Sequence, residues 1–184
     1  DKKTVGMPYV LMIHKFFPMA NAFFSALGFN VVLTDPTSEE TLRLSQLAAQ
    51  GETCYPVKLI YGHMMQLIEK KVDYIFLPSI HTMRHEKSRV AHNYGCVYMQ
   101  TAAKSVARAL KLEEKGITLL NPEFDLDFGQ EAMASAMVGL GKILGIHKLK
   151  CAAALLAGAM AVRRHTAAVE KQGKALLATL KPED

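Results

Sequence analysis

The sequence DYIFLP at residues 73–78 decides the fold class. Its apolar residues follow one another without the alternation of a half-exposed strand, and this is typical of a parallel strand buried on both faces. Apolar runs that contain β-branched residues predict two more strands, at residues 30–34 and 116–120. Residues 5–13 predict a fourth strand, in which Pro8 marks an edge or a bend.

Helical patterns separate these strands, because apolar residues recur there at the spacing of one helix face. The predicted helices cover residues 16–27, 39–50, 55–68, 102–110 and 131–144. Residues 79–93 are predicted to form an irregular loop, and residues 94–100 a short strand or a loop. The alternation predicts an α/β domain with a Rossmann-like, doubly wound, mainly parallel sheet of about four strands and flanking helices. Ligands of such domains bind outside the carboxyl ends of the strands.

The pattern changes after residue 145. Large apolar residues repeat every seven positions, and a second set follows them four positions on. The two sets are Leu155, Val162, Val169 and Leu176, and Ala159, Thr166, Gly173 and Leu180. We therefore predict an α/β domain at residues 1–145 and a helical extension at 146–184, formed by one long helix or by two broken near Gly173. Its seam of small residues predicts close packing, either over the sheet or on a part of the protein outside this sequence.

Composition narrows the function classes. The chain has 184 residues, half of them hydrophobic, which suits one ordinary domain with a sizeable core. Its formal charge of +5 is modest, and no aromatic residues are interleaved with the basic ones, so we expect no nucleic-acid binding. The longest apolar run, 151–162, is too short to span a membrane. Three widely spaced cysteines and no signal peptide indicate the cytoplasm, and the missing initiator methionine indicates a fragment.

Cys54 is the first candidate site residue. It stands in the sequence GETCYPVK at 51–58, and Pro56 favours the first turn of a helix. Cys54 is therefore predicted at or just before a helix N-terminus, where a thiolate is favoured over a thiol. Thiolates attack electrophiles and bind soft metals. Lys58, one turn into that helix, either neutralises an anion or is simply exposed.

Cys96 is the second candidate, because Gly95 gives it a local turn. Cys151 begins an alanine-rich helix and is predicted to be a small packing residue. Four histidines lie near the cysteines in sequence, and we interpret each as a surface or core residue. They are His63, His81, His85 and His92. A phosphate-binding glycine loop, a nucleophile elbow and a zinc-binding His-Glu-x-x-His motif are all missing from the sequence.

Several segments resemble a known family when they are taken in order. They are 5–8, 16–18, 23–24, 27–29, 31–33, Glu52-x-Cys54-x-Pro56-Val57-Lys58, Gly62-His63, 72–78, and Cys96 with Gln100. Together they resemble the domain of acyl-CoA dehydratase activase-related proteins, which are relatives of the iron–sulfur subunits of 2-hydroxyacyl-CoA dehydratases and benzoyl-CoA reductases. The resemblance covers residues 4–120.

The resemblance implies that Cys54 and Cys96 give thiolates to a [4Fe–4S]-type cluster, with a further ligand from a second domain outside this chain. An ATP-hydrolysing activase would supply the electron, which would pass towards reductive chemistry on a CoA thioester in an anaerobe. Two features depart from the family. Val97 replaces the proline that commonly follows the second cysteine, and no third ligand is evident in the chain. Either the rest of the site lies elsewhere, or the cluster is absent.

Two functions therefore remain open. The first is an iron–sulfur cluster-associated electron-transfer domain of a larger protein, which is part of a reductive system and not a complete enzyme. The second is a non-catalytic α/β domain that binds a small ligand or a partner in the crevice of the sheet. A thiol-dependent enzyme ranks third, because no histidine is obviously paired with Cys54 or Cys96.

Overall fold

Four short parallel strands form the central sheet of the computed structural model, which describes residues 2–49, 51–85 and 87–180. The order across the sheet is β2-β1-β3-β5, and each neighbouring pair is parallel. The strands are β1 (Thr4–Met7), β2 (Asn30–Leu33), β3 (Tyr74–Phe76) and β5 (Thr118–Leu120). This order confirms the predicted doubly wound α/β fold with a mainly parallel sheet of about four strands.

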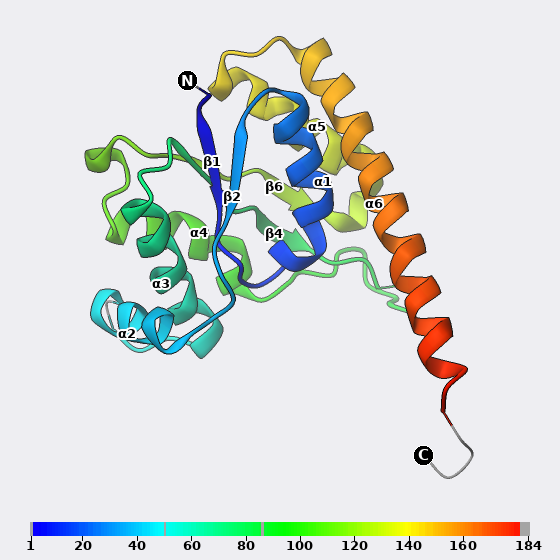
Figure 1. The fold of residues 1–184 in the computed structure, drawn as a ribbon, viewed down its shortest axis with the longest axis horizontal. Coiled ribbons are helices and arrows are strands. Elements are labelled where there is room, and N and C mark those ends of the chain that lie inside the picture. The colour runs from blue at the N-terminus through cyan, green and yellow to red at the C-terminus, as the bar shows by residue number, and fades with distance from the viewer. Residues whose placement is uncertain (1, 50, 86, 181–184) are drawn as a thin grey trace.

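Helices cover both faces of this sheet (Figure 1). In the described residues they are α1 (Ile13–Ala26), α2 (Glu39–Ala48), α3 (Tyr55–Glu69), α4 (Val97–Ala109), α5 (Gly129–Leu144) and α6 (Lys148–Leu177), with short 3-10 turns η1 (Glu113–Lys115) and η2 (Leu126–Phe128). Right-handed crossovers place α1 on one face and α2, α3 and α4 on the other, because the chain moves in opposite directions from β1 to β2 and from β2 to β3. α5 and α6 lie on the side of α1.

A second parallel pair, which sequence reasoning missed, extends two strands of the sheet. It consists of β4 (Ser79–Thr82) and β6 (Glu123–Asp125). The Ser79 N–H donates to the Pro122 carbonyl at 3.0 Å, so the pairing of β3 with β5 continues into these strands. Pro78 and Pro122 interrupt the ladder because proline has no N–H. The prediction of an irregular loop at 79–93 is therefore wrong for its first four residues.

Two predicted boundaries also need correction. The strand predicted at 5–13 ends at Met7, and the apolar residues after Pro8 form a turn and the start of α1. The apolar run continues past Met7 because residues of the turn and of the helix start, such as Val10, are also buried. It does not indicate a longer strand. The strand or loop predicted at 94–100 is wrong in its second half, where α4 begins. The last residue of the helix predicted at 39–50 lies outside the described residues.

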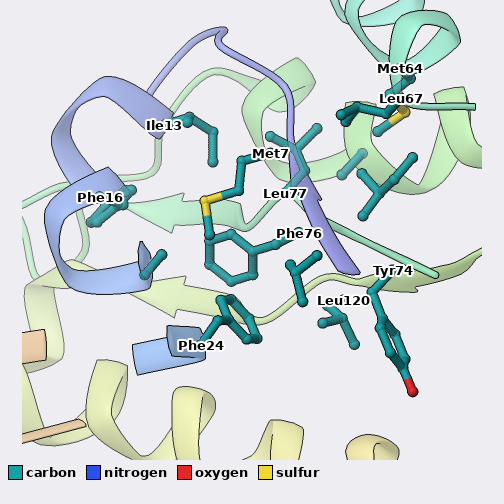
Figure 2. Close-up of a cluster of buried hydrophobic side chains, with 14 of the residues drawn as sticks. Met7, Ile13, Phe16, Phe24, Met64, Leu67, Tyr74, Phe76, Leu77 and Leu120 are labelled. Carbon is teal, nitrogen blue, oxygen red and sulfur yellow. The ribbon is translucent and has the colours of Figure 1, made fainter. Parts of the chain in front are cut away.

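Aromatic and sulfur-containing side chains fill the core between the sheet and α1 (Figure 2). Met7, Phe24 and Phe76 are all fully buried. The Phe24 and Phe76 rings pack edge to face, with centroids 5.2 Å apart and planes at 69°. Because Phe24 comes from α1 and Phe76 from β3, this contact fixes α1 against the middle of the sheet.

The C-terminal segment forms one helix of 30 residues, and Gly173 does not break it. Only its first third is buried, through Cys151, Ala154 and Gly158. A Cβ on Gly158 would lie 2.9 Å from the Met19 carbonyl oxygen, so α6 approaches α1 at a point where only glycine fits. α6 packs mainly on α1 and α5, so of the two predicted alternatives it does not cover the sheet directly, and packing on a part outside this sequence stays a prediction. The division at residue 146 into two units stays a prediction.

Candidate functional site

Cys54 and Cys96 each precede the first residue of a helix. Cys54 is the N-cap of α3, as predicted, and Cys96 is the N-cap of α4. Both side chains are exposed, and both are free of disulfides. Neither side chain makes a capping hydrogen bond. Each sulfur is therefore free to bind, beside backbone N–H groups that favour negative charge.

The two helices begin at the same edge of the sheet. α3 leads into β3 and α4 leads into β5, and these strands are parallel. Each helix therefore runs antiparallel to the strands and begins at their carboxyl edge, where ligands of such folds bind. α3 and α4 also pack against each other on one face of the sheet. The fold thus brings Cys54 and Cys96 to one face of that edge.

Local structure around Cys54 explains its position. Gly51 has φ 93°, which a glycine adopts without strain, and the chain then turns into α3. The Cys54 carbonyl accepts the N–H groups of Val57 and Lys58 at 3.0 and 3.1 Å. The Lys58 ammonium binds the Glu52 carboxylate at 2.8 Å and holds the pKa of that carboxyl below its usual range. The charge of Lys58 is therefore already paired beside the cysteine.

Cys96 is held by contacts of the segment before it with β4 and with Met83, the residue that follows β4. The Gly95 N–H donates to the His81 carbonyl, and the Met83 N–H donates to the Asn93 carbonyl, both at 2.8 Å. The Gln100 side-chain amide then donates to the Gly95 carbonyl at 3.0 Å. Gln100, which the resemblance singled out, thus fixes the turn that carries Cys96.

A cavity of about 140 Å³ lies between α3 and α4, and its lining includes Thr53, the residue before Cys54. Thr53 and Val57 line one side, and Tyr98, Thr101 and Ser105 line the other. The Thr53 hydroxyl oxygen is buried and has no hydrogen-bond partner in the described part of the chain. The sequence alone did not single out Thr53, because Thr53 lines a cavity only once α4 packs opposite it. This space suits a ligand of only a few heavy atoms or ordered water.

Large apolar side chains next to the cysteines face solvent. Tyr55 follows Cys54 and is 59% exposed, and Val97 follows Cys96 and is 62% exposed. Tyr94 is exposed as well. Large apolar side chains that are exposed close together are typical of surfaces that contact another protein.

His63 lies inside the protein and is fully buried. The Thr34 hydroxyl lies 2.6 Å from Nδ1, and the Thr37 hydroxyl lies 3.1 Å from Nε2. Burial, and to a lesser extent the nearby His14, lowers the pKa of His63 to about 4. Both ring nitrogens are thus satisfied in a neutral ring, and of the predicted alternatives, a surface or a core residue, His63 is a core residue.

The other candidates lie apart from this edge or are dispersed. Cys151 is buried between α5 and α6, where burial raises the pKa of its thiol, and it is the packing residue that the sequence predicted. His85 and His92 are exposed. Within residues 2–49, 51–85 and 87–180, no three Cys, His, Asp or Glu side chains are grouped to hold a metal ion.

The described helices include none that combines the length and the apolar character needed to cross a bilayer.

Comparison with protein families gave a match that extends over nearly the whole chain. A family described as "CoA enzyme activase uncharacterised domain" matches residues 4–184. The match includes α6, which lies beyond the residues 4–120 that carried the resemblance. Neither a curated protein nor a solved structure matches the chain.

Proposed function

The chain belongs to this family of CoA enzyme activase domains, and from that premise we propose that it presents Cys54 and Cys96 as thiolate ligands to an iron–sulfur cluster. The observation that carries the proposal is the shared position of the two cysteines. Both are exposed N-caps, and their helices begin side by side at the carboxyl edge of the sheet. Soft thiolates are the ligands that such clusters require.

The donor set fits one part of a cluster site. Two thiolates come from this chain, whereas a [4Fe–4S] cluster is held by four ligands in its common form. The exposed Tyr55, Tyr94 and Val97 support a second domain or protein that covers this edge and brings the missing ligands. An ATP-hydrolysing activase and a protein that holds a CoA thioester are the partners we propose, in a reducing, anaerobic cytoplasm.

The chain's own residues have three tasks in this proposal. The N-termini of α3 and α4 stabilise the negative charge of the thiolates. The Glu52–Lys58 pair and the Gln100–Gly95 hydrogen bond hold the two turns that carry the cysteines. The apolar side chains at the rim keep water from the sulfurs once the partner is in place. When bound, the cluster would supply low-potential one-electron transfer.

Iron binding tests the proposal. The chain is reconstituted anaerobically with iron and sulfide, and a small thiol is added to complete the ligand set. We expect the parent to retain iron and acid-labile sulfide in equal amounts, with the visible absorption of a cluster. Cys54→Ser/Cys96→Ser should lose both, because neither hydroxyl replaces a thiolate as a soft ligand.

Cys151→Ala is the matched control for this experiment. It removes a thiol that is buried away from the proposed site, so its iron content should equal that of the parent. Equal iron in the parent and the double serine variant would refute the assignment of these ligands. The cluster proposal would be refuted if the parent binds no iron as this chain and also binds none within any longer natural protein.

The cavity between α3 and α4 favours a second candidate function, a domain that binds a small ligand without a cluster. The buried Thr53 hydroxyl lines that cavity without a partner in the described residues, and a polar atom of a ligand would satisfy it. We predict that Thr53→Val raises the free energy of unfolding of the ligand-free chain by about 1 kcal/mol, because an unpaired buried hydroxyl is destabilising. Urea unfolding measures this change. A lower stability of the variant would show that the hydroxyl is already paired.

A further inference from the structure

The second half of α6 has no covering element in the described chain. All residues from 162 to 180 are exposed, and Figure 1 shows α6 running past the body of the protein. At about 1.5 Å per residue, the 30 residues of α6 span about 45 Å and the 14 residues of α1 about 21 Å. α6 therefore extends beyond the helix that supports its first third, although its apolar face continues.

That face has the spacing of a coiled-coil seam. Leu155, Val162, Val169 and Leu176 repeat every seven residues, and Ala159, Thr166, Gly173 and Leu180 follow them four positions on. Val169 is 51% exposed and Leu176 is 66% exposed. Large residues thus occupy one core position of each heptad, and residues that are mostly small occupy the other.

We propose that the free half of α6 pairs with α6 of a second copy of this chain in an antiparallel coiled coil. In the antiparallel arrangement, the core position with large residues in one helix faces the core position with mostly small residues in the other helix. The central layers then place Val169 opposite Thr166, Val162 opposite Gly173 and Leu176 opposite Ala159. Large side chains fill the space that small ones leave, which packs the two helices closely. A parallel pair would place Gly173 opposite Gly173 and leave a gap.

Opposite charges on the two copies favour the same antiparallel register. With those layers, Arg163 of each copy flanks the seam opposite Glu170 of the second copy, and two-fold symmetry repeats the pair. Arg164 and Lys171 lie on the outer side of the helix, away from the second copy. The antiparallel arrangement also sets the positive end of each helix dipole near the negative end of the other.

Mass measurement of the full chain across a range of protein concentrations tests this pairing. We expect the mass of the parent to rise from 20.3 kDa to twice that value. Val162→Glu/Val169→Glu should stay monomeric, because both glutamates would be buried without a partner charge. Met160→Glu/Ala167→Glu is the matched control, since both positions lie on the outer side, and it should associate like the parent. The residues of both variants are exposed in the single chain, and circular dichroism checks that the fold is kept.

A charge exchange tests the orientation. Arg163→Glu alone and Glu170→Arg alone should each weaken association about tenfold, because two attractive pairs become repulsive. A mixture of the two variants should form a heterodimer with the affinity of the parent, since each glutamate again faces an arginine. A parent that stays monomeric at all concentrations, or a dimer that Val162→Glu/Val169→Glu leaves intact, would overturn the proposal and assign the face to a different protein. A mixture no tighter than its components would overturn the antiparallel register.

Discussion

Gly62→Ala is expected to lower the free energy of unfolding by about 3 kcal/mol, although alanine favours helices more than glycine does by about 1 kcal/mol. Gly62 lies in α3 at its closest approach to α2. A Cβ at this position would overlap the Thr41 carbonyl oxygen and the Ser45 hydroxyl oxygen. The carbonyl belongs to the backbone of α2, so it cannot move aside as the end of a flexible side chain could.

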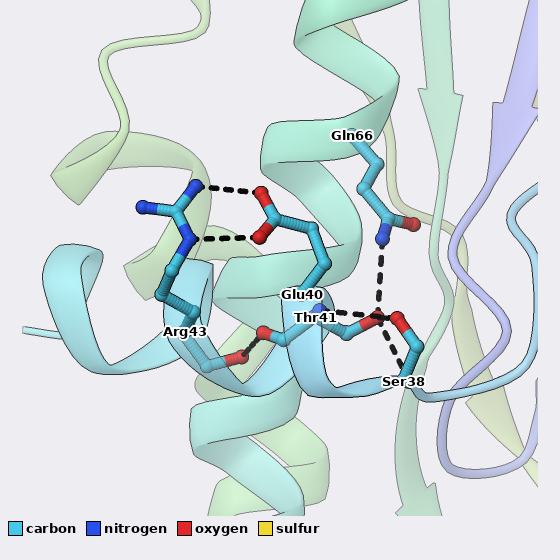
Figure 3. Close-up of polar contacts among 6 residues, drawn as sticks. Ser38, Glu40, Thr41, Arg43 and Gln66 are labelled. Atoms are coloured by element: carbon cyan, nitrogen blue, oxygen red, sulfur yellow. Dashed lines mark hydrogen bonds and ion pairs between the residues drawn. The ribbon is translucent and has the colours of Figure 1, made fainter.

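Hydrogen bonds also join α2 and α3 at this contact. The Ser45 hydroxyl donates to the Thr41 carbonyl at 2.8 Å and accepts the Gly62 N–H at 3.1 Å. Gln66, one turn further along α3, donates to the Thr41 hydroxyl, which also closes the capping box with Ser38 (Figure 3). An added methyl group would separate the helices and break the bond between Ser45 and Gly62. Overpacking and a broken buried hydrogen bond each cost about 1–3 kcal/mol.

Gly139→Ala is the matched control for that experiment. Gly139 lies inside α5, and its added Cβ would meet no atom within 4 Å in the described structure. The same substitution should there raise the free energy of unfolding by about 0.5–1 kcal/mol through helix propensity alone. Urea unfolding of the three proteins measures both changes. Equal stability of Gly62→Ala and the parent would show that α2 and α3 separate at little cost.

The sequence predicted the main elements of the fold because their periodicity is local. The strand at 73–78 and the helix that begins at Tyr55 each carry their own pattern, and both are confirmed. β4 and β6 carry no such pattern, since most of the residues in Ser79–Thr82 and Glu123–Asp125 are polar and a proline precedes each strand. Their pairing follows from the sheet, which single-segment reasoning does not include.

Part of the candidate site was predicted as well, again where the sequence signal is local. Pro56 marks the helix start after Cys54, so its capping position could be predicted. For Cys96 only the preceding glycine was informative, and the position of Cys96 at the start of α4 is known from the structure. That both helices begin at one edge depends on strand order, and the cavity with Thr53 depends on helix packing. Neither is encoded in a local motif.

Acid is expected to destabilise the protein through His63, by about 3 kcal/mol in total. The pKa of His63 is lowered to about 4 in the folded protein, first by burial and then by His14, whereas the unfolded chain has an ordinary histidine value of 6.5. The unfolded state therefore binds more protons between these two values. The contribution of neutral His63 to stability is fully present above pH 6.5 and is lost as the pH falls to about 4.

Two measurements isolate this contribution. Urea unfolding between about pH 7 and pH 4.5 should give a free energy that falls steadily in the parent and much less in His63→Gln, which cannot titrate there. The carboxyl groups of Glu40, Glu52 and Glu123 have lowered pKa values, so their contribution to stability also begins to fall at the acid end of this range, but they are present in both proteins and cancel in the comparison. NMR titration of the imidazole protons of His63 gives its pKa directly. A midpoint near 6.5, or parallel pH profiles of the two proteins, would show that the ring accepts a proton inside the fold and that Thr34 and Thr37 stabilise the cation as well as the neutral form.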